Sequence, residues 1–228
     1  MNKQKKLIFA SAIAALAISG TAGATVINYG SQLDSNSVPT TNVASATVLT
    51  FESGSCAPAS CSGSNYAIVD GSTNGHNAAP GTPTAGAGTQ DTTKYLTVPE
   101  NLSTKPQSTT ISVGSGNHYF GLLWGSIDTY NTLTFLLDDG TNLSYTGTDI
   151  ITPEPANGNQ TAASTNSYVN FFQLPAFNAV TLASTRYAFE SDNLAYSDVP
   201  EPGNLVLFGL GALALLVGFR RRFSGRSS

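Results

Sequence analysis

Short apolar runs, separated by turn-forming residues, make up the central part of this sequence. Between residues 25 and 198, Gly, Asn, Asp, Ser and Pro interrupt the apolar residues every few positions. No stretch of about 10–15 residues has the apolar spacing of a helix, whereas short bounded runs with aromatic and β-branched residues are typical of strands. The sequence therefore predicts one all-β domain over residues 25–198, long enough for one sizeable core.

Many short strands without helices predict a single β-sandwich with a jelly-roll-like arrangement. The apolar runs place the predicted strands at Thr47–Phe51, Tyr66–Val69, Tyr95–Val98, Thr110–Val113, Tyr119–Trp124, Thr132–Leu137, Tyr168–Phe172, Val180–Leu182, Tyr187–Glu190 and Leu194–Tyr196. Tyr119–Trp124 is apolar on both faces, which predicts a central strand.

The segment from residue 132 to 140 predicts a strand and the turn after it. Alternation places Leu133, Phe135 and Leu137 on one face. Asp138-Asp139-Gly140 then supplies a hairpin turn. Two other stretches, 71–93 and 152–167, have no periodic pattern and are rich in small residues or proline. We expect them to be loops, the first of them long, mobile and on the surface.

Charged residues are scarce and unevenly distributed. Only 11% of the residues are charged, and most of the Lys and Arg residues lie at the two ends. Between residues 25 and 199, three basic residues (Lys94, Lys105 and Arg186) stand against thirteen acidic ones, a net charge of −10. A nucleic-acid-binding domain needs clustered Lys and Arg to neutralise phosphates, so this composition argues against one.

The N-terminus has the three parts of a secretory signal peptide, which we place at residues 1–24. Lys residues at positions 3, 5 and 6 precede an apolar run over residues 7–18, and small residues then lead to Ala22 and Ala24. Signal peptidase cleaves after such an A-x-A-like site, so we expect the mature chain to begin at Thr25. A buried or amphipathic N-terminal helix is the alternative, but the segment lacks a polar face.

The C-terminus, residues 199–228, combines a proline-rich motif, an apolar segment and a basic tail. The motif is followed by uncharged residues 205–219, which as a helix would span roughly 22 Å. That is shorter than the ~30 Å hydrocarbon core, so the segment is a poor permanent span. A basic tail, residues 220–228, stays cytoplasmic by the positive-inside rule. An ordinary single-span anchor remains the alternative. The residues concerned are Val199, Pro200, Glu201, Pro202, Arg220, Arg221 and Arg222.

This tail resembles the PEP-CTERM sorting signal of bacterial exosortase substrates. Pro200-Glu201-Pro202, the short apolar segment and the arginine cluster occur in that order at the end of the chain. The resemblance implies a Gram-negative cell, processing by exosortase, a transient inner-membrane anchor through residues 205–219, and export to the cell surface or extracellular matrix. The two prolines keep the tripeptide extended, which suits a processing enzyme.

The predicted domain resembles one group of exosortase-dependent surface proteins. Residues 119–133 match its hallmark segment, and the later blocks at 146–150, 168–171 and 188–193 follow in order. This group implies no catalytic activity, so the resemblance informs location and fold and leaves the molecular function open.

Cys56 and Cys61 are the two cysteines of the chain. An oxidising compartment favours a disulfide between them, although so short a loop gains only about 2 kcal/mol. Free thiols are the alternative, and zinc would need ligands beyond His76 and His118.

Nucleophilic catalysis has little support in the sequence. His76 lies in a predicted loop and His118 precedes a strand. Ser126 and Asp128 are close to His118 in sequence, but this does not place three side chains in a triad, and the chain has no G-x-S-x-G motif. We therefore assign no catalytic residue.

Glu190 and Asp192 are two positions apart and share one face of a predicted strand. Retaining glycosidases need two carboxyl groups about 5–5.5 Å apart, but the further Glu of the jelly-roll glycosidase pattern is missing here. The second interpretation is structural calcium, the only cofactor that we consider, with Glu52 and Asp192 as candidate ligands beside strand ends. Of the aromatic residues, Tyr119 and Tyr130 could stack on sugars, whereas Trp124 is expected in the core.

The preferred hypothesis is an exported, non-enzymatic surface or matrix protein that associates with exopolysaccharide or biofilm. Its expected partners are signal peptidase, exosortase and exopolysaccharide, and not nucleic acid. The alternatives are a secreted glycan-active enzyme, such as a glycoside hydrolase, and a carbohydrate-binding module on a jelly-roll scaffold. Exposed aromatics would favour the module, and an open groove with two facing carboxylates would favour the enzyme.

Processing of the tail can be tested directly. In a host with exosortase, we expect protein extracted from the cell surface to lack residues 205–228, because the short apolar segment is a transient anchor. Intact-mass spectrometry measures this, and a full-length tail on surface protein would favour the permanent anchor instead. Pro200→Ala with Pro202→Ala should leave uncleaved protein in the inner membrane.

Overall fold

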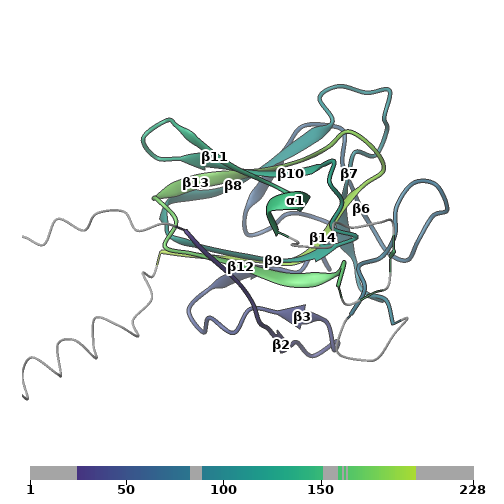
Figure 1. Ribbon diagram of the computed structural model, residues 1–228, viewed down its shortest axis with the longest axis horizontal. Coiled ribbons are helices and arrows are strands. Elements are labelled where there is room, and N and C mark those ends of the chain that lie inside the picture. The colour runs from purple at the N-terminus through teal and green to yellow at the C-terminus, as the bar shows by residue number, and fades with distance from the viewer. Residues whose placement is uncertain (1–24, 83–88, 151–158, 161, 163, 199–228) are drawn as a thin grey trace, which may run out of the picture.

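The computed structural model describes residues 25–82, 89–150, 159, 160, 162 and 164–198. The fold has two facing layers, a seven-stranded and a five-stranded sheet, with a two-stranded ribbon beside the larger one (Figure 1). The larger sheet contains β1 (Val26–Tyr29), β12 (Ser167–Phe172), β9 (Tyr119–Gly125), β14 (Phe189–Ser197), β7 (Tyr95–Val98) and β6 (Ala67–Val69), and β4 (Thr47–Leu49) also pairs with β14. The smaller sheet contains β11 (Asn142–Thr146), β10 (Asn131–Leu137), β13 (Phe177–Ser184), β8 (Ser108–Asn117) and β5 (Ser60–Ser62). The ribbon pairs β2 (Gln32–Leu33) with β3 (Pro39–Thr40), and α1 (Gly147–Ile150) is a single helical turn.

The strand order agrees with the predicted jelly-roll-like sandwich. From β7 to β14, successive strands alternate between the two sheets, except that the β10–β11 hairpin stays in the smaller sheet. The neighbours within each sheet are antiparallel. The four central strands β12-β9-β14-β7 thus lie opposite β11-β10-β13-β8, which is the two-sheet layout of a jelly roll.

Aromatic side chains from both sheets form the core between the layers. Phe135 meets Phe120 edge-on, with ring centroids 5.5 Å apart, and Phe177 at 5.2 Å. Trp124 stacks on Phe189 at 4.4 Å, which confirms the predicted core position of the tryptophan. These arrangements suit the quadrupoles of aromatic rings, so the packing adds to the large apolar area that the rings bury.

The predicted hairpin and central strand are confirmed. Leu133, Phe135 and Leu137 are buried and alternate with half-buried residues along β10. The turn has Gly140 at φ 84°, which glycine adopts without strain, and the chain returns as β11. Every residue of β9 is buried, as expected of a strand between β12 and β14.

Strand β14 corrects one prediction. The two segments predicted as separate strands, Tyr187–Glu190 and Leu194–Tyr196, belong to one strand that runs from Phe189 to Ser197. Its pairing with β9 shifts between Asp192 and Ala195, and Asn193 has φ 47°. This β-bulge and its polar residues interrupt the apolar pattern without ending the strand. The sequence also missed β1, β2, β3 and β5, which are short and mostly exposed, with the exception of β3.

The stretch at residues 71–93 is only in part the surface loop that the sequence predicts: residues 71–76 are exposed, whereas residues 78–82 are buried. Ala78, Ala79, Thr82 and Asp91 are each at most 5% exposed. Its small residues allow close packing: a Cβ on Gly81 would lie 2.8 Å from Asn166 Cγ. Small residues at Ala78, Ala79 and Gly81 therefore serve close packing in the buried part of this stretch. Most of the second predicted loop, 152–167, lies outside the described residues, and its last residue begins β12.

Cys56 and Cys61 form the predicted disulfide, with Cα atoms 5.8 Å apart, and Cys56 packs against the main core. The predicted signal peptide and the apolar tail segment lie outside the described residues. Within the part of the chain that the structure describes, there is no helix long and apolar enough to cross a membrane.

Candidate functional site

The outer face of the seven-stranded sheet, turned away from the five-stranded sheet, carries the acidic residues of β14. Phe189 and Leu194 belong to the core between the sheets. Glu190 and Asp192, one and three positions after Phe189, therefore point to the opposite face, because side chains alternate along a strand. The bulge at Asn193 then returns Leu194 to the core side. Residues 71–82, here called the covering segment, pack over this face, and both carboxyl-bearing residues are at most 2% exposed.

Glu190 anchors the covering segment to the sheet. Its Oε1 accepts a hydrogen bond of 2.9 Å from the backbone N–H of Ala78, while Oε2 is buried with no partner within hydrogen-bonding distance. Burial raises the pKa of Glu190 to about 8; the bond from Ala78 opposes the shift, and the charge of Asp128 adds to it. The carboxyl group is therefore mostly protonated at neutral pH.

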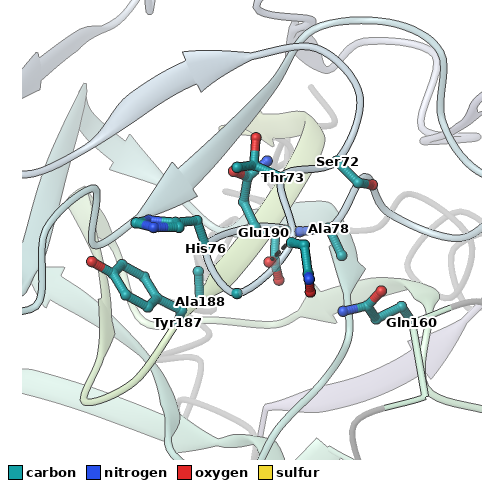
Figure 2. A pocket seen from close by; sticks show the side chains of 11 residues that line it. Ser72, Thr73, His76, Ala78, Gln160, Tyr187, Ala188 and Glu190 are labelled. Atoms are coloured by element: carbon teal, nitrogen blue, oxygen red, sulfur yellow. Dashed lines mark hydrogen bonds between the residues drawn. The ribbon is translucent and has the colours of Figure 1, made fainter.

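A hollow lies beside this anchor, between the covering segment and Tyr187, which comes two residues before β14 (Figure 2). Its volume is about 370 Å³. His76 lies against Tyr187 on one side, with ring centroids 4.7 Å apart, and Glu190 lies at the centre of the lining. The remaining lining is small or neutral and polar: Ser72, Thr73, Asn74, Gly75, Asn77, Ala78, Gln160 and Ala188.

A second, smaller hollow of about 230 Å³ is lined in part by the same turn at residues 73–77. It shares Thr73, His76 and Asn77 with the first hollow, and Pro99 and Glu100 are among its other lining residues. The turn is closed by a backbone hydrogen bond of 2.9 Å from Thr73 N–H to Asn77 O. Asn77 Nδ2 also donates to the Tyr95 hydroxyl, which itself donates to Gly71 O at 2.6 Å. These bonds fix the wall between the two hollows.

The calcium candidates lie near one another, together with an acid that the sequence did not single out. The carboxyl groups of Asp91 and Asp192 are close enough for each to influence the pKa of the other, and the charge of Glu52 raises the pKa of both. Burial raises the pKa of Asp192 well above its ordinary value, and Asp91 adds to this shift. Thr93 Oγ1 donates to Asp192 Oδ2 at 3.3 Å.

One oxygen of each paired carboxyl group, Asp91 Oδ2 and Asp192 Oδ1, is buried and makes no hydrogen bond to a donor group of the described chain. Two adjacent buried carboxylates repel each other, so the pair must share a proton or hold a cation. Among the described residues, no group of three or more His, Cys, Asp or Glu side chains is arranged around a metal position.

The structure does not assemble a catalytic triad from the residues considered in the sequence. His118 Nδ1 lies 2.8 Å from Leu174 O at the start of β9, whereas Ser126 and Asp128 follow the end of that strand. A strand of this length separates its ends by roughly 20 Å. Asp128 instead accepts a hydrogen bond of 2.6 Å from the Tyr130 hydroxyl.

The aromatic residues proposed for sugar stacking are occupied by other contacts. The Tyr119 hydroxyl is buried and bonds to Thr41 Oγ1 and Asn170 Oδ1. Arg186 lies over the Tyr130 ring at 5.5 Å from its centroid. The sequence missed the His76–Tyr187 pair, and no local signal could have found it, because the two residues meet only after β14 has paired within its sheet.

The remaining predicted site residues lie at the two ends. Thr25, the predicted first residue of the mature chain, comes directly before β1. The others lie outside the described residues: Ala22, Ala24, Val199, Pro200, Glu201, Pro202, Arg220, Arg221 and Arg222.

Comparison with known families supplies the information on these terminal residues. The family of the PEP-CTERM protein-sorting motif matches residues 198–222 of the chain. The match contains the Pro-Glu-Pro tripeptide, the apolar segment and the first arginines, so the chain carries the predicted sorting motif. This is the signal of exported proteins that pass through the membrane and undergo exosortase-dependent processing on their way to the cell surface. No curated protein and no solved structure matches the chain.

The anchor makes a prediction about pH. The pKa of Glu190 rises from 4.5 in its ordinary environment to about 8 in the fold. The Glu190 carboxyl group therefore makes its full contribution to the free energy of unfolding below about pH 4.5. This contribution is lost as the pH rises to about 8, because folding must then take up a proton. One pKa unit corresponds to about 1.4 kcal/mol, so the loss should reach a few kcal/mol.

Glu190→Gln keeps an acceptor for Ala78 and removes the titration. Urea unfolding at several pH values should show a smaller decline toward pH 8 in this variant than in the wild type. Glu100→Gln, at an exposed position, is the matched control and should leave the profile unchanged. An identical pH profile for Glu190→Gln and the wild type would contradict the assigned role of the anchor.

Proposed function

We propose that the mature protein is a non-enzymatic surface or extracellular-matrix protein of a Gram-negative cell, which associates with exopolysaccharide or biofilm. The observation that carries this proposal is the sorting motif at residues 198–222, which directs proteins to exosortase-dependent export. Signal peptidase removes residues 1–24 in this scheme, and exosortase removes the tail.

The composition of the exported part supports this role. Residues 25–199 contain three basic and thirteen acidic residues, so long-range attraction to anionic polymers is absent. Contact with a polysaccharide must therefore use neutral hydrogen bonds, stacking or bridging cations. In the hollow beside Glu190, neutral polar side chains offer hydrogen bonds, and the rings of His76 and Tyr187 offer stacking.

The environment of Glu190 supports a non-enzymatic role over a glycoside hydrolase. A retaining pair needs two carboxyl groups that face the substrate about 5–5.5 Å apart. Glu190 is 2% exposed and is held by Ala78, and Asp192 is engaged with Asp91 and Thr93. A substrate in the hollow would meet a Glu190 carboxyl group that already accepts a hydrogen bond from Ala78, and Asp192 is not among the residues that line the hollow.

A structural calcium ion at the paired acids is the cofactor that fits this function. Calcium prefers carboxylate and other oxygen ligands, and it would replace the shared proton when Asp91 and Asp192 ionise. Backbone, hydroxyl or water oxygens would have to complete the coordination, since Glu52 already accepts a hydrogen bond from Lys94 N–H at 3.0 Å. Such an ion would stabilise the sheet that carries the hollow.

Co-sedimentation tests the proposal. Mature protein should pellet with purified matrix polysaccharide from the producing cell, weakly and less in the presence of a chelator, without releasing soluble sugars. Polysaccharide from an unrelated organism is the control. Soluble oligosaccharide that appears with the wild type and disappears with Glu190→Gln would overturn the non-enzymatic role. Equal binding with and without the chelator would contradict a role for calcium and would leave the proposed surface role standing.

A further inference from the structure

We propose that the two hollows that share the 73–77 turn form one binding site for a neutral oligosaccharide. This inference rests on the proposed function and names the site and the ligand class through which the surface protein would contact a polysaccharide. Small-molecule sites are concave and hold a few fixed polar groups, and the first hollow, at about 370 Å³, has the size of such a site.

The lining suits a sugar because its exposed side chains are neutral and can both donate and accept hydrogen bonds. Asn74 and Gln160 carry amides, and Ser72 and Thr73 carry hydroxyls. An amide offers two donors and an acceptor, and a hydroxyl offers both roles, which matches the hydroxyl groups of a sugar ring. These side chains are exposed and therefore accessible to a ligand.

The His76–Tyr187 pair supplies a flat surface beside these polar groups. The rings are 4.7 Å apart at an interplanar angle of 41°, so they form a tilted pair in which His76 is exposed and Tyr187 is partly exposed. Apolar C–H groups of a sugar ring pack against such surfaces while the hydroxyl groups reach the amides. Both rings are visible at the rim of the hollow in Figure 2.

The site is held in place before a ligand binds. The turn between the hollows is closed by backbone hydrogen bonds, and its base is fixed by the bonds from Asn77 to Tyr95 and from Ala78 to Glu190. The Tyr187 hydroxyl accepts a hydrogen bond of 3.3 Å from Leu102 N–H. Rigid walls reduce the entropy lost on binding, which favours the weak contacts that carbohydrates make.

Charge selects a neutral ligand over an acidic one. Among the described residues, neither hollow is lined by a Lys or Arg side chain that could pair with an acidic ligand, and the exposed Glu100 carboxylate beside the second hollow would repel one. The nearest basic side chain along the chain, Arg186, is already placed over the Tyr130 ring. Because both hollows share the 73–77 turn, the ligand is expected to cross it and to be more than one sugar unit long.

Binding of defined oligosaccharides tests the inference. Mature protein extracted from the cell surface is applied to an array of neutral and uronic-acid oligosaccharides of three to six units, and hits are titrated calorimetrically. Tyr187→Ala and His76→Ala should each weaken binding of a neutral oligosaccharide by about tenfold, the effect of losing roughly 1.4 kcal/mol. Tyr187→Phe keeps the ring but loses the bond from Leu102 N–H, so it should weaken binding less than Tyr187→Ala does.

The controls separate this inference from the proposed function. Tyr29→Ala removes an exposed tyrosine at the far edge of the same sheet and should bind as the wild type does. His76→Ala alters an exposed turn, so it tests the site even where Tyr187→Ala perturbs folding. Equal binding by His76→Ala and the wild type, or a preference for uronic acids, would overturn the inference while association with the matrix stands. No binding to any oligosaccharide or to the matrix would overturn both.

Discussion

The fold depends on covering the outer face of β14. This strand lies inside the larger sheet, and its core side is packed by Phe189 and Leu194. Its other side carries two carboxyl groups, which in a sandwich with one solvated face would point into water. Here the covering segment lies on Glu190, to which the bond from Ala78 ties it, while Asp91 and Thr93 lie against Asp192. The hollow lies beside this contact, and its turn is held by backbone bonds and by the bond from Asn77 to Tyr95.

Burying acids without basic partners has a consequence for their charge state. Glu190, Asp91 and Asp192 all have a raised pKa, with burial as the main cause. Buried carboxyl groups are tolerated when they are protonated or bound to a cation, because an unpaired charge in the interior is costly. The protonated state of Glu190 therefore leaves the lining of the hollow without a full negative charge, in keeping with the neutral ligand that we propose.

The sequence predicted the features that depend on residues close together in the chain. The sorting tail could be recognised because its three parts are adjacent in the chain, and the inward side of β10 followed from the alternation around Phe135. The anchor could not be predicted in this way, since Ala78 and Glu190 are 112 positions apart. The composition of residues 71–82 was misleading, because Gly and Ala serve a flexible loop and a closely packed segment equally well.

The same difference between local and long-range contacts applies to the candidate site. Glu190 and Asp192 were predicted to share a strand face and they do, but the pairing partner Asp91 comes from a distant segment. The His76–Tyr187 pair depends on the turn that Tyr95 holds and on the residues that lead into β14. Such contacts arise from the pairing of β7 with β14, which no single stretch of sequence encodes.

Hydrogen–deuterium exchange at the amide of Ala78 measures the contact on which this account depends. The account predicts slow exchange of this amide in the wild type, because it donates to a buried carboxyl group, and fast exchange in Glu190→Ala. The rest of β14 should remain protected in both proteins. Exchange of the Ala78 amide at the rate of an unstructured peptide in the wild type would show that residues 71–82 do not cover the sheet, and would contradict the account.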